Sequence, residues 1–100
     1  MNKYEAMFII KPDLSEEDRK TLFGQIQDAI VKNGGQIATA VIWAEKRKLI
    51  FPLKKQQEGV YYLVNFSAPS EAITKLKYTF KLNEQILRVL ILRPDEKKKK

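Results

Sequence analysis

Residues 60–67 of the chain read VYYLVNFS, a run of aromatic and branched apolar side chains that is typical of a β-strand. Side chains alternate between the two faces of a strand, so the even-numbered residues of this run share one face, and all of them are apolar. We expect that face to lie against the protein core. The opposite face carries Tyr61 and Leu63 before it becomes polar at Asn65 and Ser67. The strand is therefore apolar on both sides over half of its length.

Downstream of this strand the sequence predicts a helix and a last strand. Pro69 suits the first turn of a helix, and residues 73, 76 and 80 (Ile, Leu and Phe) give that helix an apolar stripe. Residues 86–93 read ILRVLILR, a strand that Pro94 ends.

Upstream, residues 36–53 predict one long, bent strand that is rich in branched and aromatic side chains. Pro52 has no N–H to donate to a neighbouring strand, so we expect this strand at an edge of the sheet. The short polar segment 54–59 connects it to the strand at 60–67 and indicates a hairpin.

The chain begins with a strand over residues 3–10 and a helix that follows the turn at Pro12-Asp13. Ser15 suits the N-cap of that helix, because three acidic residues follow it in the first turn and complement the helix dipole. An apolar stripe continues the helix at Leu22, Ile26, Ala29 and Ile30. Asn33-Gly34-Gly35 supplies a left-handed stop.

The predicted order is therefore strand, helix, strand, strand, helix, strand. This βαββαβ order predicts a ferredoxin-like α+β fold, a four-stranded antiparallel sheet with both helices on one face. We expect residues 1–94 to form this single domain and the basic residues 95–100 to form a disordered tail.

The sheet face that the helices leave open is less polar than this plan requires. Six apolar residues of the first, third and last strands point to it: Met7, Ile9, Tyr61, Leu63, Leu90 and Leu92. The first and third strands are central in this fold, so we expect one patch, with Lys3, Arg88 and Arg93 at its rim. A contiguous apolar patch usually marks an interface. We predict that it binds a partner protein; self-association and chance exposure are the alternatives.

The composition limits the available chemistry. The chain has 100 residues and contains no Cys and no His, which excludes a disulfide scaffold, a thiol nucleophile and a Cys-based zinc site. We predict no catalytic residue, no metal site, no cofactor and no small-molecule substrate. No stretch reaches the roughly 20 apolar residues of a membrane helix, and the N-terminus lacks the apolar segment of a signal peptide. We expect a cytoplasmic protein that does not bind membranes.

The charge balance favours a polyanionic partner. The chain has 19 Lys and Arg against 12 Asp and Glu, a formal net charge of +7, and nucleic acid is the first candidate for such a surface. The candidate RNA-binding residues lie around the hairpin and on the first and last strands: Lys3, Lys46, Arg47, Lys48, Lys54, Lys55, Arg88 and Arg93. Contacts of this kind reach phosphates, so they position the RNA and do not specify its sequence.

Two other functions remain open for this order of elements. An RNA-recognition motif that binds single strands by stacking has the same order, but of its basic-Gly-aromatic-Gly-aromatic signature the segment 58–62 (EGVYY) keeps little more than Gly59. A small acyl-phosphate-hydrolysing enzyme of this fold would need an anion-cradling loop after the first strand. Residues 11–14 read KPDL there, with an acidic residue and no glycine.

Three segments carry a further signal when they are taken in order. They are Tyr4-Glu5 with Pro12 following, residues 47–54 (RKLIFPLK) followed by Gly59 and Tyr61, and residues 83–90 (NEQILRVL). Together they resemble the bacterial small-subunit ribosomal protein six family, although Ala44-Glu45 and Ile50 replace a usual Gly and a common Ala. The resemblance implies a ferredoxin-like fold, a ribosome-associated structural protein, and joint binding of ribosomal RNA with the eighteenth small-subunit ribosomal protein.

Overall fold

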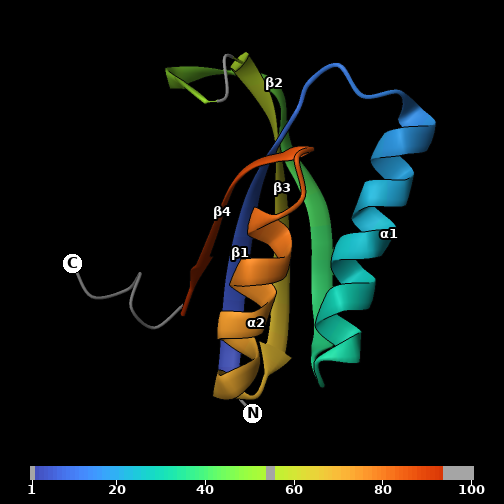
Figure 1. The fold of residues 1–100 in the computed structure, drawn as a ribbon, viewed down its shortest axis with the longest axis vertical. Coiled ribbons are helices and arrows are strands. Elements are labelled where there is room, and N and C mark those ends of the chain that lie inside the picture. The colour runs from blue at the N-terminus through green and yellow to red at the C-terminus, as the bar shows by residue number, and fades with distance from the viewer. Residues whose placement is uncertain (1, 54–55, 94–100) are drawn as a thin grey trace.

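The computed structural model describes residues 2–53 and 56–93, and it describes side chains outside residues 44–57. The elements follow in the order β1 (Asn2–Ile10), α1 (Glu16–Lys32), β2 (Gln36–Leu53), β3 (Gln56–Ala68), α2 (Ser70–Lys81) and β4 (Ile86–Leu92) (Figure 1). The strands form one antiparallel four-stranded sheet in the order β2-β3-β1-β4. The predicted ferredoxin-like α+β architecture is confirmed, with β1 and β3 at the centre of the sheet.

Both helices cover the same face of the sheet (Figure 1). Helix α1 begins after Ser15, whose hydroxyl accepts a hydrogen bond from the Asp18 N–H at 3.1 Å. This confirms the predicted N-cap. Leu22, Ile26 and Ile30 of the predicted apolar stripe are buried, so the stripe is the side of α1 that faces the sheet.

The chain leaves α1 through two glycines. Gly34 has a φ of 86°, in the left-handed region that favours glycine. Gly35 donates its N–H to the Ile30 carbonyl at 2.9 Å. A Cβ at Gly35 would lie 2.6 Å from Ile30 Cγ2, 2.9 Å from the Ile30 carbonyl oxygen and 3.1 Å from the Ser67 carbonyl oxygen. Glycine at this position therefore lets the end of α1 approach β3 closely.

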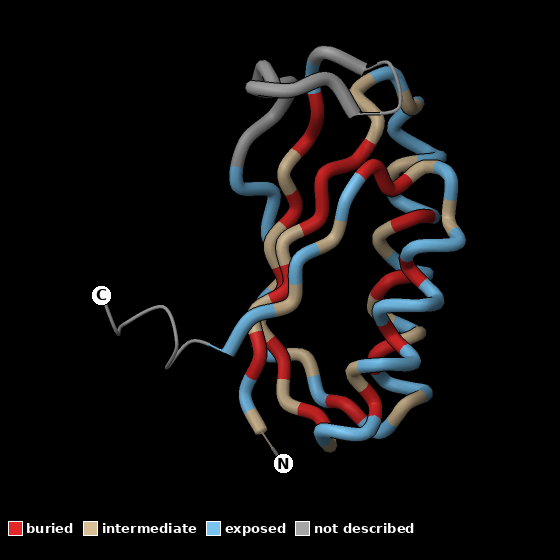
Figure 2. Tube along the Cα trace, turned by 60° about the vertical axis from the view of Figure 1, so that its left-hand side comes forward, coloured by how far each residue is buried: buried red, intermediate tan, exposed pale blue. Residues whose placement is uncertain are grey.

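The core fills the space between the helices and the sheet, where Figure 2 shows the buried stretches of both layers. The even-numbered residues of β3 from Val60 to Phe66 are at most 2% exposed, as the sequence predicts. The rings of Phe8 and Phe80 form a T-shaped pair with centroids 4.9 Å apart, and Phe23 stacks on Tyr62 at 3.8 Å. Burial raises the pKa of the Tyr62 phenol, and a 2.9 Å hydrogen bond from Gln27 to its oxygen opposes the rise.

The hairpin differs from the prediction. Strand β3 begins at Gln56, so residues 56–59 of the predicted connection 54–59 are strand, and that expectation is wrong. The reason is cross-strand pairing, because Glu58 and Gly59 pair with β2 at Lys48 and Arg47. Pairing of this kind overrides weak β propensity. Strand β2 does reach Leu53 at an edge of the sheet, as Pro52 predicts, whereas the predicted tail at 95–100 lies outside the described residues.

Candidate functional site

Two apolar rows cross the sheet face that the helices leave open. In the first row, Met7 pairs with Leu90 on one side and with Leu63 on the other, and Leu63 pairs in turn with Val41. Residues paired across antiparallel strands share a face, so this row spans all four strands. In the second row, Ile9 pairs with Arg88 and Tyr61.

The ring of Trp43 lies 5.6 Å from the ring of Tyr61 between centroids, which extends the second row to β2. We call the whole set the open-face patch; it consists of Met7, Ile9, Val41, Trp43, Tyr61, Leu63, Leu87, Leu90 and Leu92. Five of the six residues that the sequence suggested for a partner protein lie in these two rows, and the structure adds Val41, Trp43 and Leu87. The sixth, Leu92, borders them in the next row, where it pairs with Glu5.

Exposure within the open-face patch is highest on the two edge strands. Val41 and Trp43 on β2 are 50% and 53% exposed, and Leu90 and Leu92 on β4 are 42% and 39% exposed. Met7, Tyr61 and Leu63 on the central strands are half-buried. The most accessible apolar surface of the patch therefore lies on its two edge strands, β2 and β4, and the central strands are less accessible.

Ile9 differs from the expectation of an exposed residue, because it is 9% exposed. It faces away from the helices as predicted, but it packs with Leu87 and Tyr61 in a small second cluster. Leu87 reaches this face through an irregularity in β4: Ile9 pairs with Arg88, whereas Ile10 pairs with Ile86, so Leu87 is the extra residue of a bulge. Strict alternation would place Leu87 on the helix side.

The signals for the added residues differ in strength. Val41 and Trp43 are two positions apart on a strand that flanks the central one, so alternation already placed them on one face. Their face could not be assigned, because β2 shifts register between Ile37 and Thr39 and again between Ile42 and Ala44. For Leu87 the sequence carries no signal of the bulge.

The open face becomes polar away from the hairpin. Asn65 pairs with Glu5 and Thr39, and its amide donates to Thr39 Oγ1 at 2.9 Å. Lys3 pairs with Ser67 in the following row. The two apolar rows therefore occupy the half of the open face that lies nearer the β2–β3 hairpin.

The predicted RNA-binding residues fall at opposite ends of the sheet. Arg88 is exposed at the hairpin end, opposite Ile9. Lys3 is exposed six residues earlier on β1, about 20 Å away at roughly 3.3 Å per residue. Arg93 is exposed directly after Leu92, which pairs with Glu5, so it lies at the Lys3 end.

Five further candidates cannot be placed in this way. The side chains of Lys46, Arg47 and Lys48 in β2, and Lys54 and Lys55 as a whole, lie outside the described residues.

The loop after β1 does not have the form of an anion cradle. The Lys11 N–H donates to the Gln85 carbonyl at 3.1 Å, so this amide is already used, and Asp13 is exposed beside it. Within residues 2–53 and 56–93, no three His, Cys, Asp or Glu side chains gather as a metal site. None of the described helices is long and apolar enough to cross a membrane.

The structure defines a ferredoxin-like α+β domain with an apolar patch on its open sheet face. The profile of the family described as Ribosomal protein S6 matches residues 3–93. The small ribosomal subunit protein bS6 of Thermoanaerobacter pseudethanolicus is 43% identical over 96 residues, which cover 96% of this chain and 100% of that protein. Its counterpart in Dictyoglomus turgidum is 43% identical over 91 residues, 91% of this chain and 93% of that protein.

The fold agrees with this match. The crystal structure of 30S ribosomal protein S6 from Thermotoga maritima superposes with a TM-score of 0.85 at 27% sequence identity, covering 98% of this chain and 92% of that one. The chain belongs to the ribosomal protein S6 family, which confirms the resemblance seen in the sequence. It is a structural protein of the small ribosomal subunit and not an enzyme.

Proposed function

We propose that this protein binds the eighteenth small-subunit ribosomal protein through the open-face patch and ribosomal RNA through basic residues around it. The observation that carries the proposal is the pair of apolar rows across the open face, with Trp43, Val41 and Leu90 between 42% and 53% exposed. A contiguous apolar surface of this kind is typical of a protein interface.

Charge supports the RNA half of the proposal. The net charge of +7 attracts a polyanion. Among the exposed cations, Arg88 ends the second row at the β4 edge, and Lys3 and Arg93 lie beyond the apolar rows at the other end of the sheet. A partner on the patch would leave these cations at the rim of the complex. The remaining candidates of the set are Lys46, Arg47, Lys48, Lys54 and Lys55.

The partner interface is tested with Leu63→Asp. Leu63 lies between Met7 and Val41 in the first apolar row, so a carboxylate there would be desolvated in the complex without a mate. We expect affinity for the eighteenth protein to fall by about a hundredfold or more, from a penalty of about 3 kcal/mol. The measurement is calorimetric titration of the two proteins.

Asn65→Asp is the matched control. It adds the same charge to the same strand and face, but in the polar row beside Thr39. We expect it to change the affinity by no more than about threefold, since rim charges contribute little. Equal affinity losses for the two variants, or no loss for either, would show that the partner protein binds another surface.

RNA binding is tested by salt. With the partner present, three to five phosphate contacts predict a log–log slope of roughly −2 to −5 between binding constant and salt concentration. Replacement of Lys46, Arg47 and Lys48 by Gln should weaken RNA binding and make the slope shallower, while the melting temperature changes little, because exposed charges contribute little to folding. A binding constant that does not respond to salt would contradict phosphate contacts.

A further inference from the structure

Strand β4 leaves one side of the sheet open to pairing. It pairs with β1 only and ends the strand order β2-β3-β1-β4. Within the part of the chain that the structure describes, no strand pairs with its outer side, where alternate main-chain N–H and C=O groups point. Its sequence from Ile86 to Leu92 (ILRVLIL) has a single charge. An apolar edge of this kind is a template for an added strand.

The cover of β4 by the helices is incomplete. Val89 pairs with Phe8, which is fully buried, yet Val89 itself is only half-buried. A pocket of about 510 Å³ lies beside it, between the end of α2 and β4. Phe80, Ile86, Leu87 and Val89 give this pocket its apolar lining.

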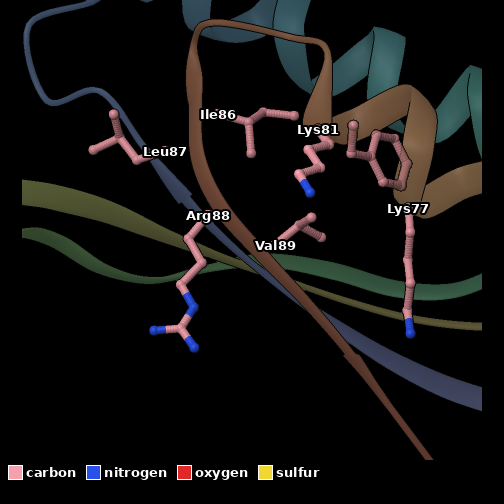
Figure 3. A pocket seen from close by; sticks show the side chains of 7 residues that line it. Lys77, Lys81, Ile86, Leu87, Arg88 and Val89 are labelled. Carbon is pink, nitrogen blue, oxygen red and sulfur yellow. The ribbon is translucent and has the colours of Figure 1, made fainter. Parts of the chain in front are cut away.

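The same pocket has a cationic rim. Lys77 and Lys81 extend from α2 and Arg88 extends from β4, with Val89 between them (Figure 3). All three cations are exposed, and the lining of the pocket includes no carboxylate. Lys77 and Lys81 are one helical turn apart, so both can meet the same extended ligand.

We propose that the outer edge of β4 and this pocket form a second protein-docking site, which takes an extended acidic segment of a partner protein as a fifth strand. An added strand would pair with the outer edge of β4 over residues 87–92 and place every second side chain towards α2. An apolar side chain would then enter the pocket, and carboxylates two residues before and after it would face Lys77 and Lys81. An apolar pocket and an unpaired strand edge suit a polypeptide, which can fill the one and pair with the other. RNA phosphates would interact with the cations alone, so a polypeptide is the favoured ligand.

The site shares Arg88 with the RNA-binding candidates and Leu87 with the open-face patch. Lys77 and Lys81 belong to neither set, so substitutions at these two lysines test this site alone. The probe is the capped peptide Val-Glu-Thr-Leu-Thr-Glu-Val, in which Glu, Leu and Glu share one face. We expect it to shift the amide resonances of residues 87–92 in the isolated protein. A peptide with Lys in place of both Glu should not bind, and N-methylation of alternate amides on the pairing side should abolish binding.

The double variant Lys77→Gln/Lys81→Gln should bind the peptide about fivefold more weakly, the sum expected for the loss of two exposed ion pairs. Lys75→Gln is the matched control, since Lys75 is exposed on the same helix but does not line the pocket. It should leave the affinity within about twofold, because a single charge remote from the ligand contributes little. The partner affinity measured for the open-face patch should not change in any of these variants, so failure here and failure of the proposed function are distinguishable.

Four results would overturn the proposal. They are an absence of shifts in residues 87–92 at millimolar peptide, binding that the Lys-substituted peptide reproduces, equal losses for Lys75→Gln and the double variant, and displacement of the peptide by oligouridylate at lower concentration than by the unlabelled peptide. The last result would assign the site to nucleic acid.

Discussion

Strand β3 presents apolar side chains on both of its faces, yet the two faces lie in different surroundings. Val64 and Tyr62 point to the helices and are at most 2% exposed. Tyr61 and Leu63 point the other way and are half-buried between their strand neighbours alone. The comparison shows that the apolar side chains of this strand exceed what the fold itself uses. The additional apolar side chains, Tyr61 and Leu63, lie in the two apolar rows of the open-face patch, where a partner protein would bury them.

The strongest test of the comparison is to place a charge on each face. Val64→Asp would bury an unpaired carboxylate at a position that is 0% exposed. We expect a loss of about 5 kcal/mol or more, which equals the whole stability of a domain at the low end of the ordinary range. Leu63→Asp should cost within about 1 kcal/mol, as surface substitutions usually do. Thermal melts of both variants make the measurement. If Leu63→Asp unfolds the protein and Val64→Asp does not, the two faces have been assigned the wrong way round.

The attachment of the covering helix is tested at Gly35. An added Cβ would meet two carbonyl oxygens, of Ile30 and Ser67, at 2.9 and 3.1 Å, and backbone moves less readily than a side chain. We expect Gly35→Ala to cost about 2 kcal/mol in unfolding free energy, the usual range for overpacking. Urea titration gives the value.

Gly24→Ala on the same helix is the control with the opposite sign. A Cβ added at Gly24 would meet nothing within 4 Å, and alanine should stabilise the helix by about 0.5–1 kcal/mol. A loss at both glycines would mean that the helix itself, and not its approach to β3, is sensitive to substitution.

A smaller effect on stability is expected at Tyr62, whose hydroxyl is a polar group on the helix-covered face of β3. Tyr62→Phe removes the hydrogen bond from Gln27, and we expect a loss of about 1 kcal/mol at pH 7. Because the folded-state pKa of Tyr62 is raised above 10.0, its contribution is complete below pH 10 and is lost as the pH rises through the folded-state value. The difference in unfolding free energy between wild type and variant, measured by urea titration, should therefore be smaller at pH 11 than at pH 8. A gap that widens at high pH would contradict this.

The smallest effect on stability is expected on the open face. Trp43→Ala should change the unfolding free energy by no more than about 0.5 kcal/mol, since the side chain is 53% exposed. Trp43 is the single tryptophan of the chain, so its fluorescence reports on this face without a label. Its emission should shift to shorter wavelength when the eighteenth protein binds, and an unchanged spectrum in a formed complex would place the partner away from β2.

The sequence was sufficient for the architecture because its signals agree with one another. The cap at Ser15, the glycine stop at Gly34 and the alternation in residues 60–67 each act over a few neighbouring residues, and each is confirmed. The start of β3 at Gln56 could not be found in this way. Its strand state depends on pairing with β2 and not on its own propensity.

The candidate site was predictable to the extent that it follows alternation. Met7, Leu63 and Leu90 fall in one row because simple period-two counting holds between them. Counting fails at Leu87, where one extra residue moves a large side chain to the other face and buries Ile9. A bulge is a relation between two strands, so the sequence of one strand does not contain it.

The strand order also determines when each pair of strands can form while the chain is being synthesised. Strand β1 is made first, but it lies between β3 and β4, and β2 lies two places away from it. A nascent chain that ends before Val60 therefore holds β1 without any strand to pair with, because Ile10 pairs with Val60 and the rest of β1 with residues made later still. The hairpin of β2 and β3 is the first pairing that can form. Since Glu5 must wait for Leu92, we expect the sheet to close only after almost the whole chain has left the ribosome that makes it.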